Sequence, residues 1–213
     1  MTLSFPPSPT SGQTYQNWQW DGAKWVPYAA PSVIVTSGNR VLLSKQTVST
    51  AVASVNFAGL LTSTYDLYEV DLYGVQFSAN SIGIAARFSS DGGTTWIATA
   101  SYNYGGWYTG AQGAANATQG VAQTMMWLSN GLDSIAVVNA ALAGRIRISH
   151  ALSTALYKFL MADTTLQNAT IAPARYSGVG SASLTTAMNS IQFLPSSAGN
   201  ITAGTFALYG IKP

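Results

Sequence analysis

The clearest pattern in the chain is a strict alternation of apolar and polar residues at 68–72 and again at 82–89. In the first run Tyr68, Val70 and Leu72 are separated by two acidic residues, and in the second run apolar residues alternate with small or polar ones. A period of two is typical of strands with one buried face, because successive side chains of a strand point to opposite sides. Both runs are therefore predicted to be strands.

The alternation continues less regularly over most of the chain. The run 150–162 has an apolar spacing that also fits a helix, but we favour a strand because its neighbours are sheet. Residues 105–115 break every period and are predicted to form a long loop. Further strands are predicted at 40–44, 48–57, 96–104, 121–128, 135–138, 144–150, 157–161, 169–176, 183–194 and 205–210.

A turn sequence follows the run 82–89 and predicts a hairpin. Its Asp-Gly-Gly segment supplies residues that tolerate positive φ, so one strand folds back on the next. Ser89, Asp91, Gly93 and Trp96 stand at the spacing Ser-x-Asp-x-Gly-x-x-Trp, which resembles the Asp-box of sialidase-type propellers and of unrelated β-proteins. The resemblance implies that the Asp caps turn amides and that the Trp packs beneath. Because propellers carry the motif in every blade and this chain shows it once, we interpret it as a structural hairpin staple.

Composition points to a protein that works in an assembly. Charged residues make up 8% of the 213 residues, against about 25% in average soluble domains, while 47% are hydrophobic. A surface so poor in charge protects a free monomer badly against association, so we expect a homo-oligomer. The net charge of +2 and the lack of a Lys/Arg cluster do not indicate a nucleic-acid or membrane partner.

The cysteine content and the first residues bear on the cellular compartment in which the protein is expected. With no cysteine, the chain has no disulfide framework and no thiolate metal site. The start lacks the basic and apolar regions of a secretory signal, and no stretch approaches about 18 apolar residues. We therefore expect a protein that is made in a cytoplasm and stays soluble or joins a particle there.

The N-terminal segment is predicted to be an extended arm followed by a tryptophan-rich hairpin. Residues 1–12 are rich in Pro and Ser and have no period. Asp21-Gly22 lies between two short aromatic runs and is predicted to be a two-residue turn that places Trp18 opposite Trp25. A lone hairpin is marginal in water, so it would benefit from a partner surface.

The hairpin also carries a family resemblance. The string Pro9-x-x-Gly-Gln-Thr-Tyr15 is followed by Trp-Asp-Gly-x-Lys-Trp-Val. This segment, within residues 6–27, resembles a module near the N-termini of tail-fibre and other virion proteins of tailed bacteriophages. The resemblance implies a docking segment that binds another virion protein. Its aromatic residues would make the contact: Tyr15, Trp18, Trp20 and Trp25. Two alternatives stay open, a sugar-binding platform on which a pyranose stacks and a self-packed hairpin with no ligand.

A boundary is predicted after the hairpin, where Pro-Ser and Ser-Gly-Asn punctuate residues 29–38. The predicted domains are therefore 1–30, the arm and hairpin, and 31–213, a β-sandwich. The densest aromatic cluster of the second domain flanks the predicted loop: Tyr102, Tyr104, Trp107 and Tyr108. If exposed, these side chains would contact a polysaccharide or a neighbouring subunit, and if buried they would cap one end of the core.

The C-terminus carries a second resemblance. Gly-Asn-Ile at 199–201, followed by Gly-Thr-Phe-x-Leu-Tyr-Gly at 204–210, is similar to the closing stretch of jelly-roll-like domains of phage virion proteins. The resemblance implies an all-β fold, an antiparallel sandwich with jelly-roll-like connections. The arm and the small Trp-rich hairpin would precede it.

Candidate catalytic chemistry is sparse. Glu69 and Asp71 lie two apart on one outward strand face, where a glycosidase pair is conceivable, but we expect a solvated surface instead. His150 is the one histidine, so a Ser-His-Asp triad would depend entirely on it, and a histidine metal cluster is impossible. No Gly-x-Ser-x-Gly elbow or phosphate loop is present. The sequence therefore predicts a protein that is not an enzyme and has no cofactor or metal.

These observations together predict a structural virion protein of a tailed phage or phage-derived particle, either a fibre, a spike or a decoration protein. It would attach to other virion proteins by its N-terminal segment and display the sandwich toward a host surface glycan, in a particle assembled in the host cytoplasm. The family resemblance implies a trimer. The alternative is a stand-alone carbohydrate-binding or adhesin module. A sialidase-like or depolymerase enzyme would need a carboxylate cluster in a cleft.

Overall fold

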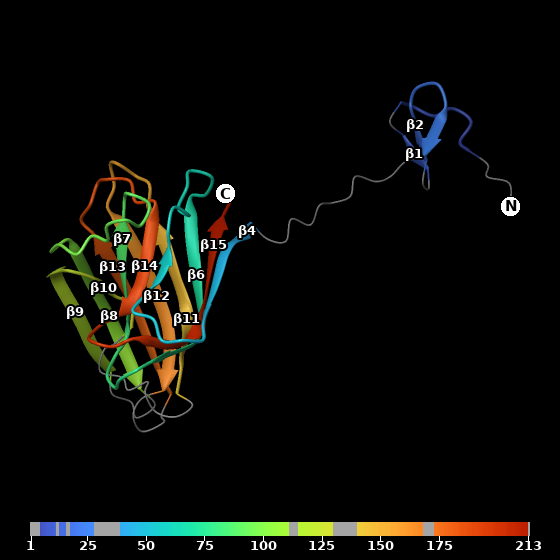
Figure 1. Cartoon of the computed structure of the whole chain (residues 1–213). Helices are drawn as coiled ribbons and strands as arrows, with labels where there is room; N and C mark the ends of the chain where they lie inside the picture. Colours follow the sequence, from blue (N-terminus) through green and yellow to red (C-terminus); the bar gives the residue numbers. More distant parts are fainter. Residues whose placement is uncertain are drawn as a thin grey trace. The chain divides into compact units, whose positions relative to one another are not determined.

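The computed structural model describes residues 5–11, 13–15, 18–27, 39–110, 115–129, 140–167 and 173–212. The chain divides into two compact units, 1–38 and 39–213 (Figure 1). In the described residues the regular structure is entirely strand. Accordingly, no helix suited to crossing a membrane is found among them.

Fifteen strands are formed in the described residues. They are β1 (Thr14–Tyr15), β2 (Trp18–Trp20), β3 (Trp25–Pro27), β4 (Arg40–Val48), β5 (Val55–Phe57), β6 (Leu67–Phe77), β7 (Ile84–Ser89), β8 (Tyr102–Gly110), β9 (Ala115–Gln123), β10 (Met126–Trp127), β11 (Leu142–Ser149), β12 (Lys158–Gln167), β13 (Pro173–Ala182), β14 (Ser190–Pro195) and β15 (Ile201–Ile211). The runs 68–72 and 82–89 are confirmed as parts of β6 and β7, and the strand preferred over a helix at 157–161 begins at Lys158.

The second unit is a sandwich of two antiparallel sheets. The larger has eight strands in the order β4-β15-β6-β11-β12-β13-β8-β9, and the smaller has four in the order β10-β7-β14-β5. Pairing is nested, because β4 pairs with β15, β5 with β14, β6 with β11, β7 with β10 and β8 with β9. Such nesting is the connectivity of a jelly roll. The predicted all-β, jelly-roll-like antiparallel sandwich is therefore confirmed.

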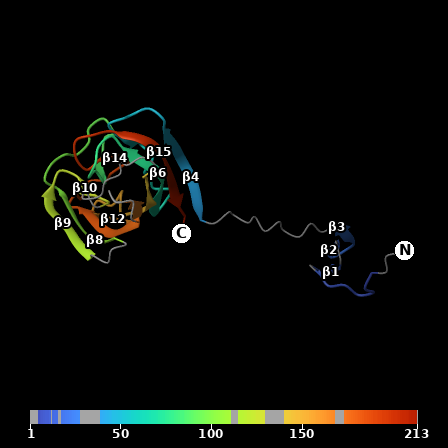
Figure 2. The same ribbon diagram turned by 90° about the horizontal axis from the view of Figure 1, so that it is seen from below.

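The hydrophobic core lies between the two sheets. Seen along the strands, β14 and β10 lie opposite β12, β8 and β9 (Figure 2). Phe193 on β14 contacts Phe57 on β5 at a ring-centroid distance of 6.2 Å and Phe206 on β15 at 5.9 Å, which joins the sheets. Strand β12 shows the alternation best, since every second residue from Lys158 to Leu166 is buried. The other face of the large sheet, here called the outer face, is turned away from the small sheet.

The segment predicted as a long loop is the main error in the predicted strands. Residues 102–110 and 115–123 form the paired strands β8 and β9, and the predicted strand at 96–104 begins at Tyr102. The glycines that break the period give room to tyrosines of neighbouring strands: a Cβ placed on Gly106 would lie 2.4 Å from Cζ of Tyr176, and one on Gly120 would lie 2.5 Å from Cζ of Tyr104. The strand predicted at 135–138 lies outside the described residues.

The turn after β7 has the contacts that its motif implies. The Ser89 hydroxyl donates to Asp91 Oδ1 at 2.6 Å, and the same carboxylate oxygen accepts the Thr95 N–H at 2.9 Å. These hydrogen bonds lower the pKa of Asp91 to about 2. Gly93 has φ of +87°, and a Cβ there would lie 3.2 Å from the ring of Trp96, which packs against it. The motif therefore holds a turn together, but the predicted hairpin of two paired strands is wrong. Strand β7 pairs with β14 and β10, and the next strand, β8, belongs to the other sheet.

The first unit contains the three-stranded sheet β1-β2-β3. The predicted register of its hairpin is wrong, because Trp20 pairs with Trp25, and Trp18 pairs with Pro27. The turn has four residues instead of two: Asp21 Oδ1 accepts the N–H groups of Ala23 and Lys24, each at 2.8 Å. A side-chain cap of this kind stabilises the longer turn and shifts the pairing by two residues.

An aromatic cluster forms the interior of the first unit. Phe5, within the predicted extended arm, stacks on Trp25 with ring centroids 5.0 Å apart. It also contacts Tyr15 at 6.1 Å and Trp18 at 5.9 Å in edge-on geometry, and Trp20 meets Trp25 at 5.7 Å. The part of the arm around Phe5 is therefore packed, and all five rings are half-buried.

Candidate functional site

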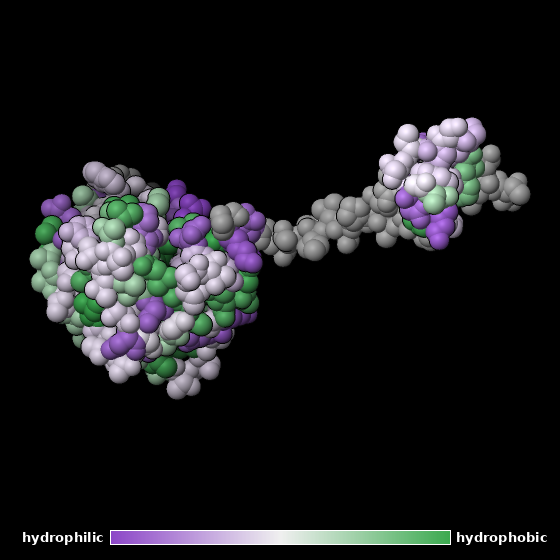
Figure 3. Space-filling model, turned by 90° about the horizontal axis from the view of Figure 1, so that it is seen from above, coloured by the Kyte–Doolittle hydropathy of each residue, from purple (hydrophilic) through white to green (hydrophobic). Residues whose placement is uncertain are grey.

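Charged side chains gather on the outer face of the eight-stranded sheet. Of the nine basic and seven acidic residues of the chain, five and three respectively lie here in its described part: Arg40, Lys45, Arg145, Arg147, Arg175, Glu69, Asp71 and Asp163. Elsewhere, as in the end view of Figure 3, strongly hydrophilic residues of the sandwich are few and stand among weakly polar and apolar ones. The outer face is thus chemically distinct from the end seen in that view.

Two carboxylates are buried on this face, contrary to the solvated surface predicted for them. Glu69 is 6% exposed and Asp71 is 4% exposed, because arginine side chains from β4 and β11 cover them. Arg40 Nη2 lies 2.6 Å from Asp71 Oδ2, and its Nε lies 2.9 Å from Glu69 Oε2 as an ion pair without hydrogen-bond geometry. Arg145 Nε donates to Asp71 Oδ1 at 2.9 Å, and Arg147 Nε donates to Glu69 Oε1 at 3.0 Å.

In this network the negative charges are buried and the positive charges lie above them at the surface. Burial acts to raise the pKa of Asp71, but hydrogen bonds from Arg40, Arg145 and Tyr73 outweigh it, so the pKa is lowered and the carboxylate stays charged. The arginine side chains above remain accessible, with Arg145 46% and Arg147 51% exposed. A molecule that approaches the face therefore meets guanidinium groups before carboxylates.

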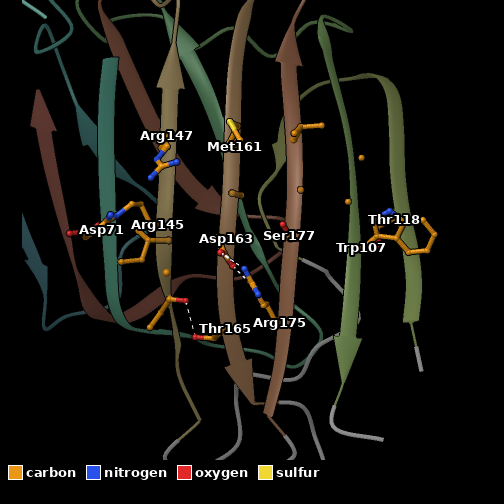
Figure 4. A pocket seen from close by; sticks show the side chains of 18 of the residues that line it. Asp71, Trp107, Thr118, Arg145, Arg147, Met161, Asp163, Thr165, Arg175 and Ser177 are labelled. Atoms are coloured by element: carbon orange, nitrogen blue, oxygen red, sulfur yellow. Dashed lines mark hydrogen bonds and ion pairs between the residues drawn. The ribbon is translucent and has the colours of Figure 1, made fainter. Parts of the chain in front are cut away.

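A groove with a volume of about 1160 Å³ runs across the outer face from β6 to β9. Figure 4 shows the arginines at its β6 and β11 side and Trp107 at the opposite side. Strand register places its residues in two rows of direct cross-strand neighbours: Arg145, Asp163, Ser177 and Trp107 in one, and Arg147, Met161, Val179 and Gly105 in the other. The groove thus has a cationic side, an apolar and polar middle, and an aromatic side.

An exposed ion pair occupies the middle of the groove. Arg175 donates to both oxygens of Asp163, from Nε at 2.8 Å and from Nη2 at 2.6 Å, as the dashed lines in Figure 4 indicate. The guanidinium of Arg175 lowers the pKa of Asp163. Because Arg175 pairs with Thr109 on β8, it is the diagonal neighbour of Trp107. A donor and acceptor pair therefore stands beside the aromatic ring.

The predicted cluster of Tyr102, Tyr104, Trp107 and Tyr108 does not form one surface. Tyr102 and Tyr108 are buried in the core, so of the two predicted alternatives the core position holds for them. Tyr104 stacks on Trp127 at 5.4 Å, on the inner side of the sheet. Trp107 alone among the four is exposed, at 63%, because the alternation along β8 turns odd-numbered residues outward.

The remaining groove residues could not be recognised in the linear sequence. The alternation at 144–150 places Arg145 and Arg147 outward, but it does not give their neighbours. Asp163 and Arg175 come from two later strands, and strand order is needed to place them beside Trp107. The signal available in sequence was the alternation of β12, where Met161 and Asp163 share the outward side.

The candidate catalytic residues are otherwise occupied. Arginines hold both Glu69 and Asp71 in ion pairs, and both carboxylates are buried beneath them. His150 follows β11 with φ of +58° and packs edge-on against Phe159 at a ring-centroid distance of 6.2 Å. These contacts assign both groups to packing and charge balance.

No family model, curated protein or solved structure matches this chain. Two features of the described residues bear on the role of the protein: the aromatic unit at 5–27 and the groove on the outer face. The resemblance to phage virion proteins rests on the sequence motifs that carry it.

Proposed function

We propose that this chain is a non-enzymatic structural protein of a tailed phage or phage-derived particle, such as a fibre, spike or decoration protein. The observation that carries the proposal is its construction from two units, a small aromatic one at 1–38 and a β-sandwich at 39–213. The first unit attaches the protein to another virion protein, and the second is displayed outward. The groove on the outer face then serves host attachment.

The aromatic unit supports the docking role. A three-stranded sheet with strands of two or three residues has little core of its own. Trp18, Trp20 and Trp25 remain half-buried after their contacts with one another and with Phe5, so apolar surface is left for a partner. Aromatic residues of this kind dominate the binding energy of protein interfaces.

Particle incorporation of the full-length chain tests this proposal. Particles from source cells that express Trp25→Ala should lose the protein, whereas particles with Trp107→Ala should retain it, as measured by immunogold labelling and mass spectrometry. The two variants are matched, since each removes one indole from a different unit. Wild-type particles without the protein would overturn the virion role, and unchanged incorporation of Trp25→Ala would overturn docking by this unit.

We further propose that the chain assembles as a homo-oligomer, with a trimer favoured. Support comes from exposed apolar residues that lie outside the groove: Val41, Leu42, Val121, Leu156, Tyr157 and Phe159. Light scattering of the full chain and of a chain that begins at Asn39 should give the same oligomer. Monomers in both cases would contradict assembly and favour a stand-alone binding module.

A carbohydrate-binding module without a virion role is the second candidate. The exposed indole of Trp107 within a groove favours it, because sugar-binding sites use aromatic platforms with nearby polar groups. Glycan affinity in a stable monomer that no particle contains would support this candidate over the first.

A further inference from the structure

The groove on the outer face combines three kinds of recognition chemistry. We propose that it binds an acidic oligosaccharide, a sugar chain that carries carboxylates. Arg145 and Arg147 bind its carboxylates, Trp107 stacks on a sugar ring, and the Asp163–Arg175 pair binds hydroxyl groups. This inference rests on the proposed display role, in which the outer face meets a host surface.

Two arginines give one side of the groove its positive charge. Arg145 and Arg147 each donate to the buried carboxylates through Nε. These hydrogen bonds do not involve the terminal nitrogens of either guanidinium. About half of each side chain is exposed toward the groove side of the sheet, while Glu69 and Asp71 lie beneath. Arginine binds a carboxylate through two parallel N–H donors, and a guanidinium already fixed by an ion pair loses less freedom when it does so.

The opposite side of the groove is aromatic. Among the tryptophans of the described residues, only Trp107 is exposed. Its outward neighbour along β8, on the side toward the start of the strand, is Gly105. A Cβ on Gly105 would meet nothing closer than 4.0 Å, so the space beside the indole is open. Met161 and Val179 extend the apolar floor toward the arginines. An aromatic platform next to aliphatic groups suits the apolar face of a sugar ring.

An exposed ion pair lies between the two sides. Asp163 offers acceptors and Arg175 offers donors, both more than half exposed. Neighbouring hydroxyls of a sugar each donate and accept, so one pair of side chains can bind two of them at once. A charged ligand without hydroxyl groups would make no such hydrogen bonds with this pair.

The dimensions fit a chain of sugars better than one ring. From Arg145 to Trp107 the row crosses β12 and β13, which is three inter-strand steps and therefore about 14 Å. A single sugar ring does not reach both ends. The occupant is thus an oligosaccharide whose acidic unit lies over β11 and whose stacked unit lies over β8.

The same features argue against a second copy on this face. A two-fold axis through the cationic side would place the exposed guanidiniums of one copy against those of the other. An acidic sugar chain instead supplies the negative charge that the surface lacks. Self-association through this face is a distinct outcome of the test below.

The test is calorimetric titration of the full-length chain with acidic oligosaccharides of defined length: oligogalacturonate, oligosialic acid and hyaluronan fragments. A malto-oligosaccharide of equal length is the neutral comparison. We expect at least one acidic probe to bind, with the affinity falling as salt rises. Trp107→Ala and Arg147→Gln should each weaken binding at least tenfold, and Arg147→Lys should recover part of the loss.

Two variants serve as matched controls. Tyr157→Ala removes an exposed aromatic ring outside the groove, and Lys24→Gln removes an exposed positive charge in the first unit. Both should bind as the wild type does. Circular dichroism of every variant verifies that the sandwich is folded.

Three results would overturn the inference: equal affinity for neutral and acidic probes, full affinity in Trp107→Ala and Arg147→Gln, or no binding of any acidic probe at millimolar concentration. If binding fails and Trp107 is protected from modification in an oligomer, the face is an interface between copies. None of these results affects the particle-incorporation test. The groove inference and the virion proposal therefore fail separately.

Discussion

The ring of Tyr176 on β13 lies over Gly106 on the neighbouring strand β8. A Cβ on Gly106 would come within 2.4 Å of Cζ of this ring, and a Cβ on Gly178 would come within 2.3 Å of its hydroxyl oxygen. Gly106 and Gly178 are direct cross-strand partners, so one tyrosine fills the space above a glycine pair. Glycine inside a strand, which normally weakens it, is here required by close approach of the ring.

Replacing Gly106 by alanine should therefore destabilise the sandwich. Tyr176 is fully buried and held on both sides, so the added methyl group forces strain of about 1 to 3 kcal/mol. Gly105→Ala is the matched control, because its Cβ would have no neighbour closer than 4.0 Å. Urea unfolding should show a lower midpoint for Gly106→Ala and a midpoint near that of the wild type for Gly105→Ala. Equal midpoints would contradict this account.

The same relationship explains why part of the fold escaped prediction. Alternation was sufficient for β6, β7 and β12, where one face is apolar. Residues 105–110 carry glycine where a core residue is expected, because the core atoms come from tyrosines of other strands. Local pattern does not contain that information. The groove escaped for a related reason, since its residues come from six strands whose order is not readable from sequence.

The arginines of the buried network should differ in their importance. Arg40 contacts both buried carboxylates and is covered in part by Tyr209, whose ring centroid lies 3.6 Å from Cζ of Arg40. Arg147 contacts one carboxylate and is half exposed. We expect Arg40→Met to cost about 2 to 4 kcal/mol, because buried charge is left under-compensated, and Arg147→Met to cost less than about 1 kcal/mol.

Chemical unfolding of both variants at neutral pH checks this order. Each substitution keeps an unbranched aliphatic side chain, so the packing of the side-chain stem is largely retained in both variants. A larger effect for Arg147→Met would mean that the accessible arginine, rather than the covered one, supports the carboxylates.

The turn at 89–96 predicts a pH dependence. The pKa of Asp91 is about 2 in the folded protein against an ordinary value of 3.8, so the folded state favours the carboxylate. Its contribution to stability is complete above the ordinary value and is lost as the pH falls through the folded value. The melting temperature of Asp91→Asn should therefore lie below that of the wild type from pH 7 to pH 5. The difference should shrink between pH 4 and pH 2, and a constant difference would show that charge is not the cause.

The aromatic unit should respond to one substitution as a whole. Trp25 contacts Phe5, Tyr15 and Trp20, so Trp25→Ala removes three ring pairs that each contribute about 0.5 to 1.5 kcal/mol. In two-dimensional NMR spectra the indole signals of Trp18 and Trp20 should move to unfolded positions. The indole signals of the second unit should stay unchanged: Trp96, Trp107 and Trp127. Unchanged Trp18 and Trp20 signals would mean that the strands, not the rings, hold this unit.

Two buried tyrosine hydroxyls differ in their hydrogen bonds, so replacing each tyrosine by phenylalanine should change the stability in opposite ways. The Tyr102 hydroxyl donates to the Ile97 carbonyl at 3.0 Å and accepts the Phe88 N–H at 2.9 Å. The Tyr176 hydroxyl has no hydrogen-bond partner in the described part of the chain. Burial raises the pKa of each phenol to about 12, so both are neutral at pH 7.

Tyr102→Phe should therefore cost about 1 to 3 kcal/mol, because it leaves a buried backbone N–H and a carbonyl without their partner. Tyr176→Phe removes an unsatisfied polar atom from the core, so it should be neutral or stabilising. Urea unfolding at pH 7 compares the two variants directly, and both keep the ring that fills the core. If Tyr176→Phe were as destabilising as Tyr102→Phe, the Tyr176 hydroxyl would have to be hydrogen-bonded in solution, and the glycine pair beneath it would have to leave room for the partner.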